Sequence, residues 1–136
     1  MNNLEQTLSI IKPDAVERDL AEEIKNEFKK NGFNIKNEKK IELTKSDAEQ
    51  FYKVHETKPF YQDLCQYLSS GPIIAMILEK ENAISANREL MGSTDPQKAN
   101  EGTLRKKYGI SIDKNSVHGS DSVENAKIEI DFFFKD

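Results

Sequence analysis

The sequence has little of several residue types on which large classes of protein depend. Its 136 residues include one cysteine, two histidines and no tryptophan. The single Cys65 excludes a disulfide within the chain, and one cysteine with two histidines gives too few ligands for a typical structural zinc site. No segment approaches the roughly 18 apolar residues that mark a membrane-spanning helix, so we expect no association with a membrane. Residues 1–6 have neither a basic nor an apolar region, and we therefore expect a cytoplasmic protein.

An excess of positive charge is also absent. The chain has 20 lysines and arginines against 24 acidic residues, a net charge of -4, which does not indicate a nucleic-acid-binding protein. Only Arg18, Arg88 and Arg105 are arginines. The guanidinium fork suits bidentate contact with phosphate, so these few arginines are more informative than the many lysines. A phosphate-binding site would have to be a local cluster of cations.

Sequence patterns predict strands separated by helices. Alternating or continuous apolar residues predict strands at 7–11, 33–43, 73–78 and 116–118. Apolar residues spaced three or four apart predict helices that begin near Leu20, at Thr44, near Tyr61, at Asn82 and near Val123. We expect Pro13 to end the first strand in a turn. We also expect 73–78, the most continuous apolar run, at the centre of a sheet, and 33–43, with its polar middle, at an edge.

This order of elements predicts one domain of α+β class over residues 1–136. It does not fit a doubly wound sheet, which would need more strands. It fits a four-stranded antiparallel sheet with a ferredoxin-like β-α-β-β-α-β core, helices on one face, an added helical hairpin and a C-terminal helix. A long loop at 92–114, with one helical turn near 102–105, precedes the last strand. Loops of this length in a compact domain are usually functional.

The densest run of chemically usable side chains is 115–122, Asn-Ser-Val-His-Gly-Ser-Asp-Ser. His118 lies just before a predicted helix that Asp121 or Ser122 can cap, and anions are favoured at such a helix N-terminus. A neutral imidazole can act there as a nucleophile toward phosphorus, and Gly119 allows another backbone to approach closely. A loop histidine in a capped turn is the simpler alternative. The chain contains neither phosphate-binding glycine motif, G-x-x-x-x-G-K-[ST] or G-x-G-x-x-G.

Further short motifs elsewhere in the chain belong to one set with this run. They are TLSIIKPDAV at 7–16, Tyr52-x-x-His55, Pro59-Phe60, Ser70-Gly71-Pro72, Asn87-Arg88-x-x-Met91-Gly92-x-Thr94-x-Pro96 and Gly102-Thr103-Leu104-Arg105. In this order and at this spacing, the chain resembles nucleoside diphosphate kinases over nearly its whole length. The resemblance implies an enzyme that transfers the γ-phosphate of a nucleoside triphosphate, mainly ATP, to a nucleoside diphosphate. It also implies a ping-pong mechanism with a phosphohistidine intermediate at His118.

The resemblance implies roles for further residues. The residues expected to bind the phosphates, sugar and base are Lys12, Tyr52, Phe60, Leu64, Arg88, Thr94, Arg105 and Asn115. The expected supporting residues are His55, Ser120 and Glu129, although His55 could equally be a structural histidine. Phe60 is the aromatic on which the base would stack, and Glu129 the carboxylate that would orient the catalytic histidine. Mg²⁺ is the implied cofactor, bound mainly through nucleotide phosphates with no direct protein ligand. The implied partners are nucleoside di- and triphosphates and further copies of the chain, in a tetramer or hexamer, with no specific nucleic acid.

The chain departs from the family pattern at a few positions. Glu22 stands where the family usually has glycine, which raises a question about the local backbone. Lys107 stands where aspartate is common, and we expect it to loosen an ion pair of the loop and to add positive charge near the phosphates. Lys58 replaces a frequent arginine. A catalytically weak regulatory relative and a protein-histidine phosphate carrier remain alternative functions, but the set of expected site residues is complete.

Overall fold

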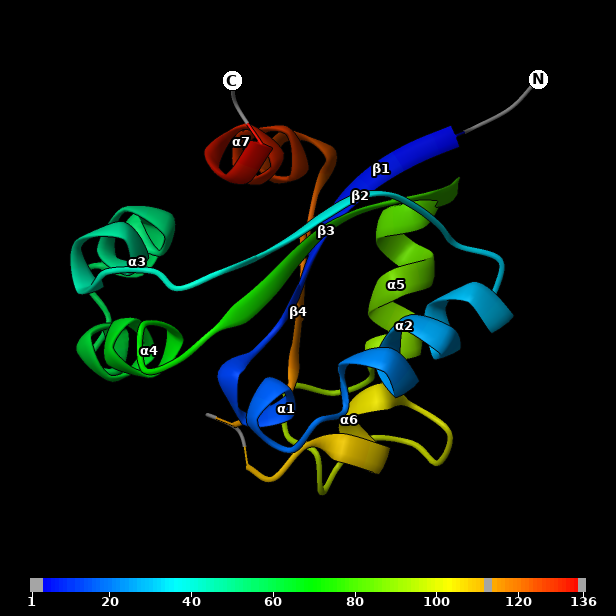
Figure 1. Cartoon of the computed structure of the whole chain (residues 1–136), viewed down its shortest axis with the longest axis horizontal. Helices are drawn as coiled ribbons and strands as arrows, with labels where there is room; N and C mark the ends of the chain where they lie inside the picture. Colours follow the sequence, from blue (N-terminus) through cyan, green and yellow to red (C-terminus); the bar gives the residue numbers. More distant parts are fainter. Residues whose placement is uncertain (1–3, 112–113, 135–136) are drawn as a thin grey trace.

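The computed structural model describes residues 4–111 and 114–134, and its strands form one sheet (Figure 1). The strands are β1 (Leu4–Ile11), β2 (Asn34–Ile41), β3 (Ile73–Glu81) and β4 (Val117–Gly119). Their order is β2-β3-β1-β4, and every neighbouring pair is antiparallel. This is the predicted four-stranded, ferredoxin-like sheet. The expected central position of β3 and the edge position of the exposed β2 are both confirmed.

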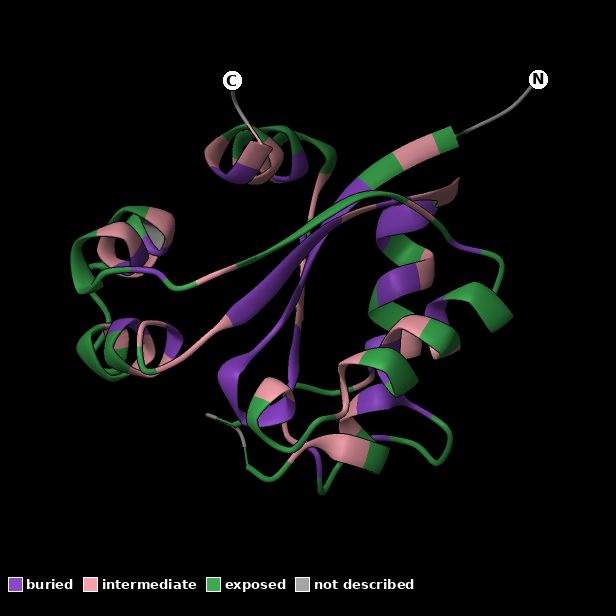
Figure 2. Ribbon diagram, in the orientation of Figure 1, coloured by how far each residue is buried: buried purple, intermediate pink, exposed green. Residues whose placement is uncertain are grey.

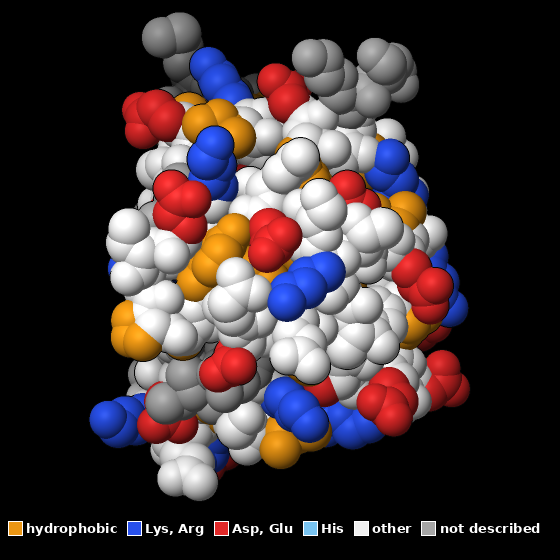
Figure 3. All heavy atoms as spheres, turned by 90° about the vertical axis from the view of Figure 1, so that its left-hand side faces the viewer, with side chains coloured by type: hydrophobic (Ala, Val, Ile, Leu, Met, Phe, Trp, Pro, Cys, Tyr) orange, Lys and Arg blue, Asp and Glu red, His pale blue; other side chains and the backbone are white. Residues whose placement is uncertain are grey.

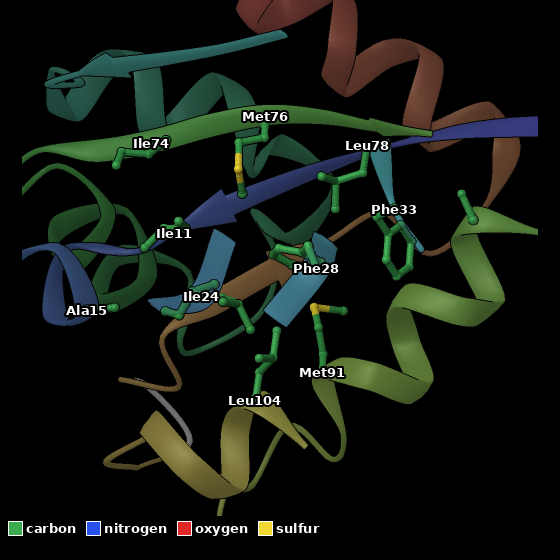
Figure 4. Packing of buried hydrophobic residues seen from close by; sticks show 12 residues of the cluster. Ile11, Ala15, Ile24, Phe28, Phe33, Ile74, Met76, Leu78, Met91 and Leu104 are labelled. Carbon is green, nitrogen blue, oxygen red and sulfur yellow. The ribbon is translucent and has the colours of Figure 1, made fainter. Parts of the chain in front are cut away.

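One face of the sheet is covered by the helices of the ferredoxin-like core and by two short helices. These are α1 (Pro13–Glu17), α2 (Ala21–Lys30), α5 (Ala83–Met91) and α6 (Leu104–Tyr108). Figure 4 shows the core between them and the sheet, in which Ile11, Met76 and Leu78 of the strands meet Phe28 and Leu104 of the helices. Burial of this apolar surface is the main force that holds these helices on the sheet.

The opposite face is covered as well, so the prediction of helices on one face is wrong. Here lie α3 (Lys45–Phe51), the 3-10 helix η1 (Lys53–His55), α4 (Tyr61–Leu68) and α7 (Val123–Phe134) (Figure 1). Leu8, Ile10 and Ala75 pack against fully buried Cys65 and Leu68 of α4. The reason lies chiefly in β3, which presents Ile74, Met76 and Leu78 to one face and Ile73 and Ala75 to the other, so an uncovered face would expose apolar side chains to water. Leu8 and Ile10 of β1 add to the second face. Figure 2 shows these central strands buried and β2 mostly exposed.

Some element ends differ from the predictions. Pro13 is the first residue of α1 and not part of a simple turn, because proline needs no backbone N–H at a helix start. Asn82 precedes α5 with a φ of 53°, and its side chain does not cap the helix as predicted. Thr44 does cap α3, in a reciprocal capping box with Asp47. Ser122 Oγ accepts from Asn125 N at 3.1 Å at the start of α7, as predicted.

The surface carries charges of both signs. On the face that bears α3 and α4, lysine, arginine and acidic side chains are interspersed (Figure 3). Glu22 lies in the first turn of α2, where an acidic side chain is favourable, and pairs with Lys25 at 2.8 Å. Lys107 pairs with Glu27 at 3.3 Å, which ties α6 to α2. Within 4–111 and 114–134, no helix is long and apolar enough to cross a membrane.

Candidate active site

His118 lies in the middle of β4, on the face of the sheet that α3 and α7 cover. It is paired with Ile10 in β1, and the preceding Val117 points into the core of the other face. His118 Nε2 is 3.0 Å from Glu129 Oε1 of α7. Ser120 Oγ donates to the same carboxylate oxygen at 2.8 Å and accepts from Leu8 N at 3.2 Å. Glu129 is thereby held by a hydroxyl that is itself anchored to β1.

These contacts determine which ring nitrogen of His118 carries a proton. A carboxylate oxygen only accepts hydrogen bonds, so the bond between His118 and Glu129 requires the ring proton on Nε2. The lone pair of a neutral ring then lies on Nδ1, the nitrogen suited to act as a nucleophile. Phe51 of α3 contacts the ring edge-to-face, with ring centroids 5.4 Å apart. Phe51 was not among the predicted site residues, and its position next to the predicted Tyr52 is the only signal of it in the sequence.

Lys12 lies at the junction of β1 and α1, where its side chain meets the segment before β4. Its Nζ donates to Asn115 Oδ1 at 3.0 Å, and Asn115 Nδ2 donates to the carbonyl of Thr94 at 3.2 Å. Both Lys12 and Asn115 are buried. The structure therefore brings together three of the predicted nucleotide-binding residues, which lie far apart in the sequence.

Arg88 and Arg105 lie beside each other at the end of α5 and on α6. With Gly92 and Thr94 they line a cavity of about 460 Å³. Arg105 Nη1 donates to the carbonyl of Gly92 at 3.1 Å and Nη2 to that of Val117 at 3.0 Å. Burial, and then the nearby charge of Arg88, lower the pKa of Arg105 to about 10. Arg105 remains a cation at neutral pH and places positive charge next to the strand of His118.

Gly92 makes this arrangement possible. It ends α5 with a φ of 82°, in the left-handed region where glycine carries no steric cost. A Cβ at this position would also lie 2.6 Å from Thr103 Oγ1, closer than real contacts allow. The turn directs the Gly92 carbonyl toward Arg105 while α6 packs beside it.

The remaining predicted residues lie on η1 and α4 and beside them. Tyr52 is buried, and burial, followed by the charge of Glu129, raises the pKa of its hydroxyl above the ordinary value. The ring of His55 lies 6.1 Å from the rings of both Tyr52 and Phe60. Burial, Lys58 and His118 lower the pKa of His55, which favours a neutral ring. Phe60 is 41% exposed, with Lys58 Nζ over its ring at 5.7 Å from the centroid, and Leu64 is partly buried against the core.

Gly119 allows a close approach, although not the approach of a backbone that the sequence analysis expected. A Cβ there would lie 2.3 Å from Asn87 Nδ2 and 2.7 Å from Met91 Cε, both on α5. Glycine is needed because helix side chains pack directly against β4 next to His118. Neither Asn87 nor Met91 was predicted to support the site, because their contact with β4 depends on how α5 crosses the sheet.

A larger hollow than the one beside Arg88 and Arg105 lies elsewhere. A cavity of about 610 Å³ is lined by Asp14, Arg18, Tyr67, Ile110 and Lys114 among others, and includes none of the predicted site residues. Volume alone would therefore indicate the wrong place. In the described part of the chain, no group of three or more histidine, cysteine, aspartate or glutamate side chains is arranged to hold a metal ion.

Comparisons with known proteins give one family. The sequence matches the nucleoside diphosphate kinase family over residues 5–136. A nucleoside diphosphate kinase of Wolinella succinogenes is 56% identical over 131 residues, which cover 96% of this chain and 96% of that protein. One of Persephonella marina is 54% identical over 132 residues, which cover 97% of this chain and 94% of that protein.

Solved structures agree with the sequence relatives. An orthorhombic crystal form of the Aquifex aeolicus nucleoside diphosphate kinase has a TM-score of 0.95 and 41% identity, covering 97% of this chain and 96% of that chain. The apo, cubic form of the nucleoside diphosphate kinase from Encephalitozoon cuniculi has a TM-score of 0.93 and 37% identity, covering 97% of this chain and 90% of that chain.

Proposed function

The chain belongs to the nucleoside diphosphate kinase family, whose function is phosphotransfer between nucleotides, and we propose that His118 carries the phosphoryl group between the nucleotides. The observation that supports this assignment is the bond from His118 Nε2 to Glu129. It holds the ring proton on one nitrogen and leaves the other nitrogen as a nucleophile, the arrangement that covalent catalysis requires.

In the first half of the proposed reaction, the lone pair of His118 Nδ1 attacks the γ-phosphorus of a nucleoside triphosphate. The nitrogen–phosphorus bond forms as the bond to the β–γ bridging oxygen breaks, and that electron pair leaves with the nucleoside diphosphate. In the second half, a terminal oxygen of another nucleoside diphosphate attacks the phosphorus, and the electron pair returns to Nδ1. The Nε2 proton stays between His118 and Glu129 throughout, so the carboxylate offsets the positive charge that develops on the ring.

The cations of the site would stabilise the transferring group. Phosphoryl transfer is accelerated mainly by positioning and by neutralising charge on the phosphate oxygens. Arg105 is fixed by the carbonyls of Gly92 and Val117, and Arg88 lies across the same cavity. We assign both to the phosphates, with Lys12 and Asn115 beside them. Phe60 would stack on the base, and because every base has a π-face, this contact gives little base specificity.

Magnesium enters the proposal with the nucleotide. The groups assigned to the phosphates are cationic side chains and an amide, which suit phosphate oxygens better than they suit a metal ion. Mg²⁺ usually keeps several waters and is commonly bound through substrate phosphates, so these residues fit an ion that the nucleotide carries. When bound, it would neutralise part of the charge on the β- and γ-phosphates.

We also propose that the chain forms a homo-oligomer, a tetramer or hexamer, in the cytoplasm. The support is its family, together with the exposed strand β2 at the edge of the sheet. Sedimentation velocity at micromolar concentration tests the assembly, and a sedimenting species of monomer mass would contradict it. Cell fractionation tests the location.

Two-substrate kinetics and labelling test the proposed mechanism. With ATP as donor and a second nucleoside diphosphate as acceptor, double-reciprocal plots should give parallel lines. The isolated protein should take label from γ-labelled ATP with Mg²⁺ in a bond that is labile to acid and stable to base. His118→Ala should lose the label, whereas His55→Gln, at the other histidine, should still form it. Converging lines, or full transfer in His118→Ala, would refute the mechanism. A label that moves to proteins but not to nucleoside diphosphates would favour a phosphate carrier, and nucleotide binding without label a regulatory relative.

A further inference from the structure

Asp14 is a buried acidic residue to which the proposed reaction gives no role. It lies in α1, two residues after Lys12, and is 5% exposed. Its Oδ1 accepts a hydrogen bond from the hydroxyl of Tyr67, and the Tyr67 oxygen in turn accepts from Asp14 N at 3.0 Å. Its Oδ2 accepts from Arg18 Nη2 at 2.9 Å and from Ser116 Oγ at 2.8 Å. The carboxylate therefore joins α1, α4 and the segment before β4.

Ser116 is held in an unusual backbone conformation by this carboxylate. Its φ is 75°, in the left-handed region that residues other than glycine rarely adopt. Such a conformation persists only where surrounding contacts impose it. Ser116 Oγ accepts from Arg18 Nη2 at 3.1 Å and has two acceptors for its one proton, Asp14 Oδ2 at 2.8 Å and the carbonyl of Tyr108 at 3.0 Å. The shorter contact is the one to the charged carboxylate. The Ser116 carbonyl accepts from Lys12 N at 2.8 Å. The residue is fully buried, so both its side chain and its backbone are fixed.

Ser116 lies between the two parts of the candidate site. Asn115 precedes it and accepts from Lys12 Nζ at 3.0 Å, while Val117 and His118 follow it in β4. A change in φ at Ser116 would rotate Asn115 relative to β4. The distance between the Lys12–Asn115 pair and His118 therefore depends on the contacts that hold Ser116.

We propose that the Asp14 carboxylate is a positioning residue, which fixes the Lys12–Asn115 pair relative to His118 through Ser116. The inference rests on the proposed function of Lys12, Asn115 and His118. An ionised carboxylate is suited to this role because its two oxygens accept from Tyr67 on one side and from Arg18 and Ser116 on the other. An asparagine of the same shape has only one accepting oxygen. In Asp14→Asn the ion pair with Arg18 is lost, and the hydroxyl of either Tyr67 or Ser116 must accept from the amide nitrogen instead of donating to a carboxylate oxygen.

The test measures the rate at which His118 takes phosphate from saturating ATP with Mg²⁺ in a single turnover. Asp14→Asn should slow this step by roughly ten- to a hundredfold, since small misplacements of groups around a reacting centre have effects of this size. Tyr67→Phe, which removes only the hydroxyl, should slow it by roughly three- to tenfold. Tyr61→Phe is the matched control, because it removes a hydroxyl of the same helix that donates to the carbonyl of Glu49 at 2.8 Å, outside the network. It should phosphorylate at the wild-type rate.

A double-mutant cycle separates positioning from a general loss of stability. If Asp14 acts through Lys12, then Asp14→Asn should have little further effect in a Lys12→Met background. The same fold-loss in both backgrounds, or wild-type rates in both Asp14→Asn and Tyr67→Phe, would overturn the inference. If Asp14→Asn does not fold, the double-mutant cycle is measured with Tyr67→Phe and Lys12→Met instead, and the same outcomes support or overturn the inference. Absence of label from the wild-type protein would refute the proposed function itself, which is a different outcome.

Discussion

The cations of the candidate site differ in how many of their donors are already used. Lys12 Nζ donates to Asn115 Oδ1, and both terminal nitrogens of Arg105 donate to backbone carbonyls. Arg88 is exposed on the last turn of α5. Lys12 and Arg105 are therefore held before a nucleotide arrives, whereas Arg88 can adjust its guanidinium fork to the phosphates. We therefore expect the paired donors of a guanidinium to matter more at Arg88 than at Arg105.

We expect Arg88→Lys to recover only part of the activity that Arg88→Ala loses. Removing one group that stabilises developing charge lowers turnover by roughly a hundredfold, and lysine restores the charge but not the paired donors. Steady-state turnover and nucleotide affinity of the two variants measure this. Lys29→Ala, at an exposed position of α2, should change neither quantity. Full recovery in Arg88→Lys would mean that a point charge is sufficient.

The exposed ring of Phe60 leads to a prediction about bases. If Phe60 only stacks, then Phe60→Ala should weaken binding of ADP, GDP, CDP and UDP by a similar factor, about 1–3 kcal/mol on the scale of single base–aromatic contacts. Phe60→Tyr keeps the ring and should keep the affinity. Calorimetric titration with the four diphosphates compares them. A loss confined to one base would show that the site also reads bases by hydrogen bonds.

At the scale of helices and strands, composition and spacing predicted which elements form but not how side chains meet across them. The strand order follows from the pattern of elements, and β2 was placed at the edge because its middle is polar. The helix α1 was missed because Pro13 ends strands as readily as it begins helices. The cover on both faces was missed although the run 73–78, apolar throughout, indicates a strand buried on both sides.

The candidate site likewise contains residues that were predicted from the sequence and residues that were not. Lys12 and Arg105 were predicted from the motifs by which the chain resembles the family, and His118 also from its place before a helix N-terminus. Ser120 and Glu129, which lie in the hydrogen-bonded chain to His118, were also expected from the resemblance. Phe51 and Tyr67 were not, because Phe51 meets His118 and Tyr67 meets Asp14 only once distant elements have packed together. Such contacts depend on helix crossing and strand register, which no local pattern encodes.

The packing of α5 against β4 gives a prediction at this scale. Gly119→Ala should lower the free energy of unfolding by about 1–3 kcal/mol, the usual cost of overpacking, because the new Cβ meets Asn87 and Met91. Adding Asn87→Ala should restore part of the loss. Gly71→Ala is the control, since a Cβ there makes only an ordinary contact with Pro13 at 3.8 Å. Denaturant unfolding of the variants measures the differences, and an unchanged Gly119→Ala would contradict this account of the packing.

On the scale of the whole molecule, the two cores on opposite faces of the sheet pack against different parts of the candidate site. The core between the sheet and α2, α5 and α6 includes Met91 and Leu104, which fix the helices that carry Arg88 and Arg105. The core on the other face includes the tyrosine, histidine and phenylalanine side chains around His118. The stability of this second core should respond to pH, because it partly buries a histidine.

We expect the free energy of unfolding to fall as the pH is lowered through the range in which His55 titrates. Burial, Lys58 and His118 lower the pKa of His55 in the folded state, against the opposing charges of Asp121 and Glu129. Below the ordinary value of 6.5, the unfolded chain binds a proton that the folded chain does not. Stability is therefore unaffected above that pH and is lost progressively below it. Urea unfolding at pH 7, 6 and 5 should show a larger decrease for the wild type than for His55→Gln, and equal decreases would contradict the assignment.

The hydrogen bond from Arg105 to the carbonyl of Val117 couples the motion of α6 to that of β4. The carbonyl belongs to the residue before His118, so the guanidinium and the imidazole are attached to neighbouring points of one backbone. A shift of α6 must either carry Val117 along or break this bond. Small shifts of α6 that keep this bond would move Arg105 and His118 together and leave the distance between them nearly unchanged. One hydrogen bond thus ties a side chain of the long loop to the motion of β4.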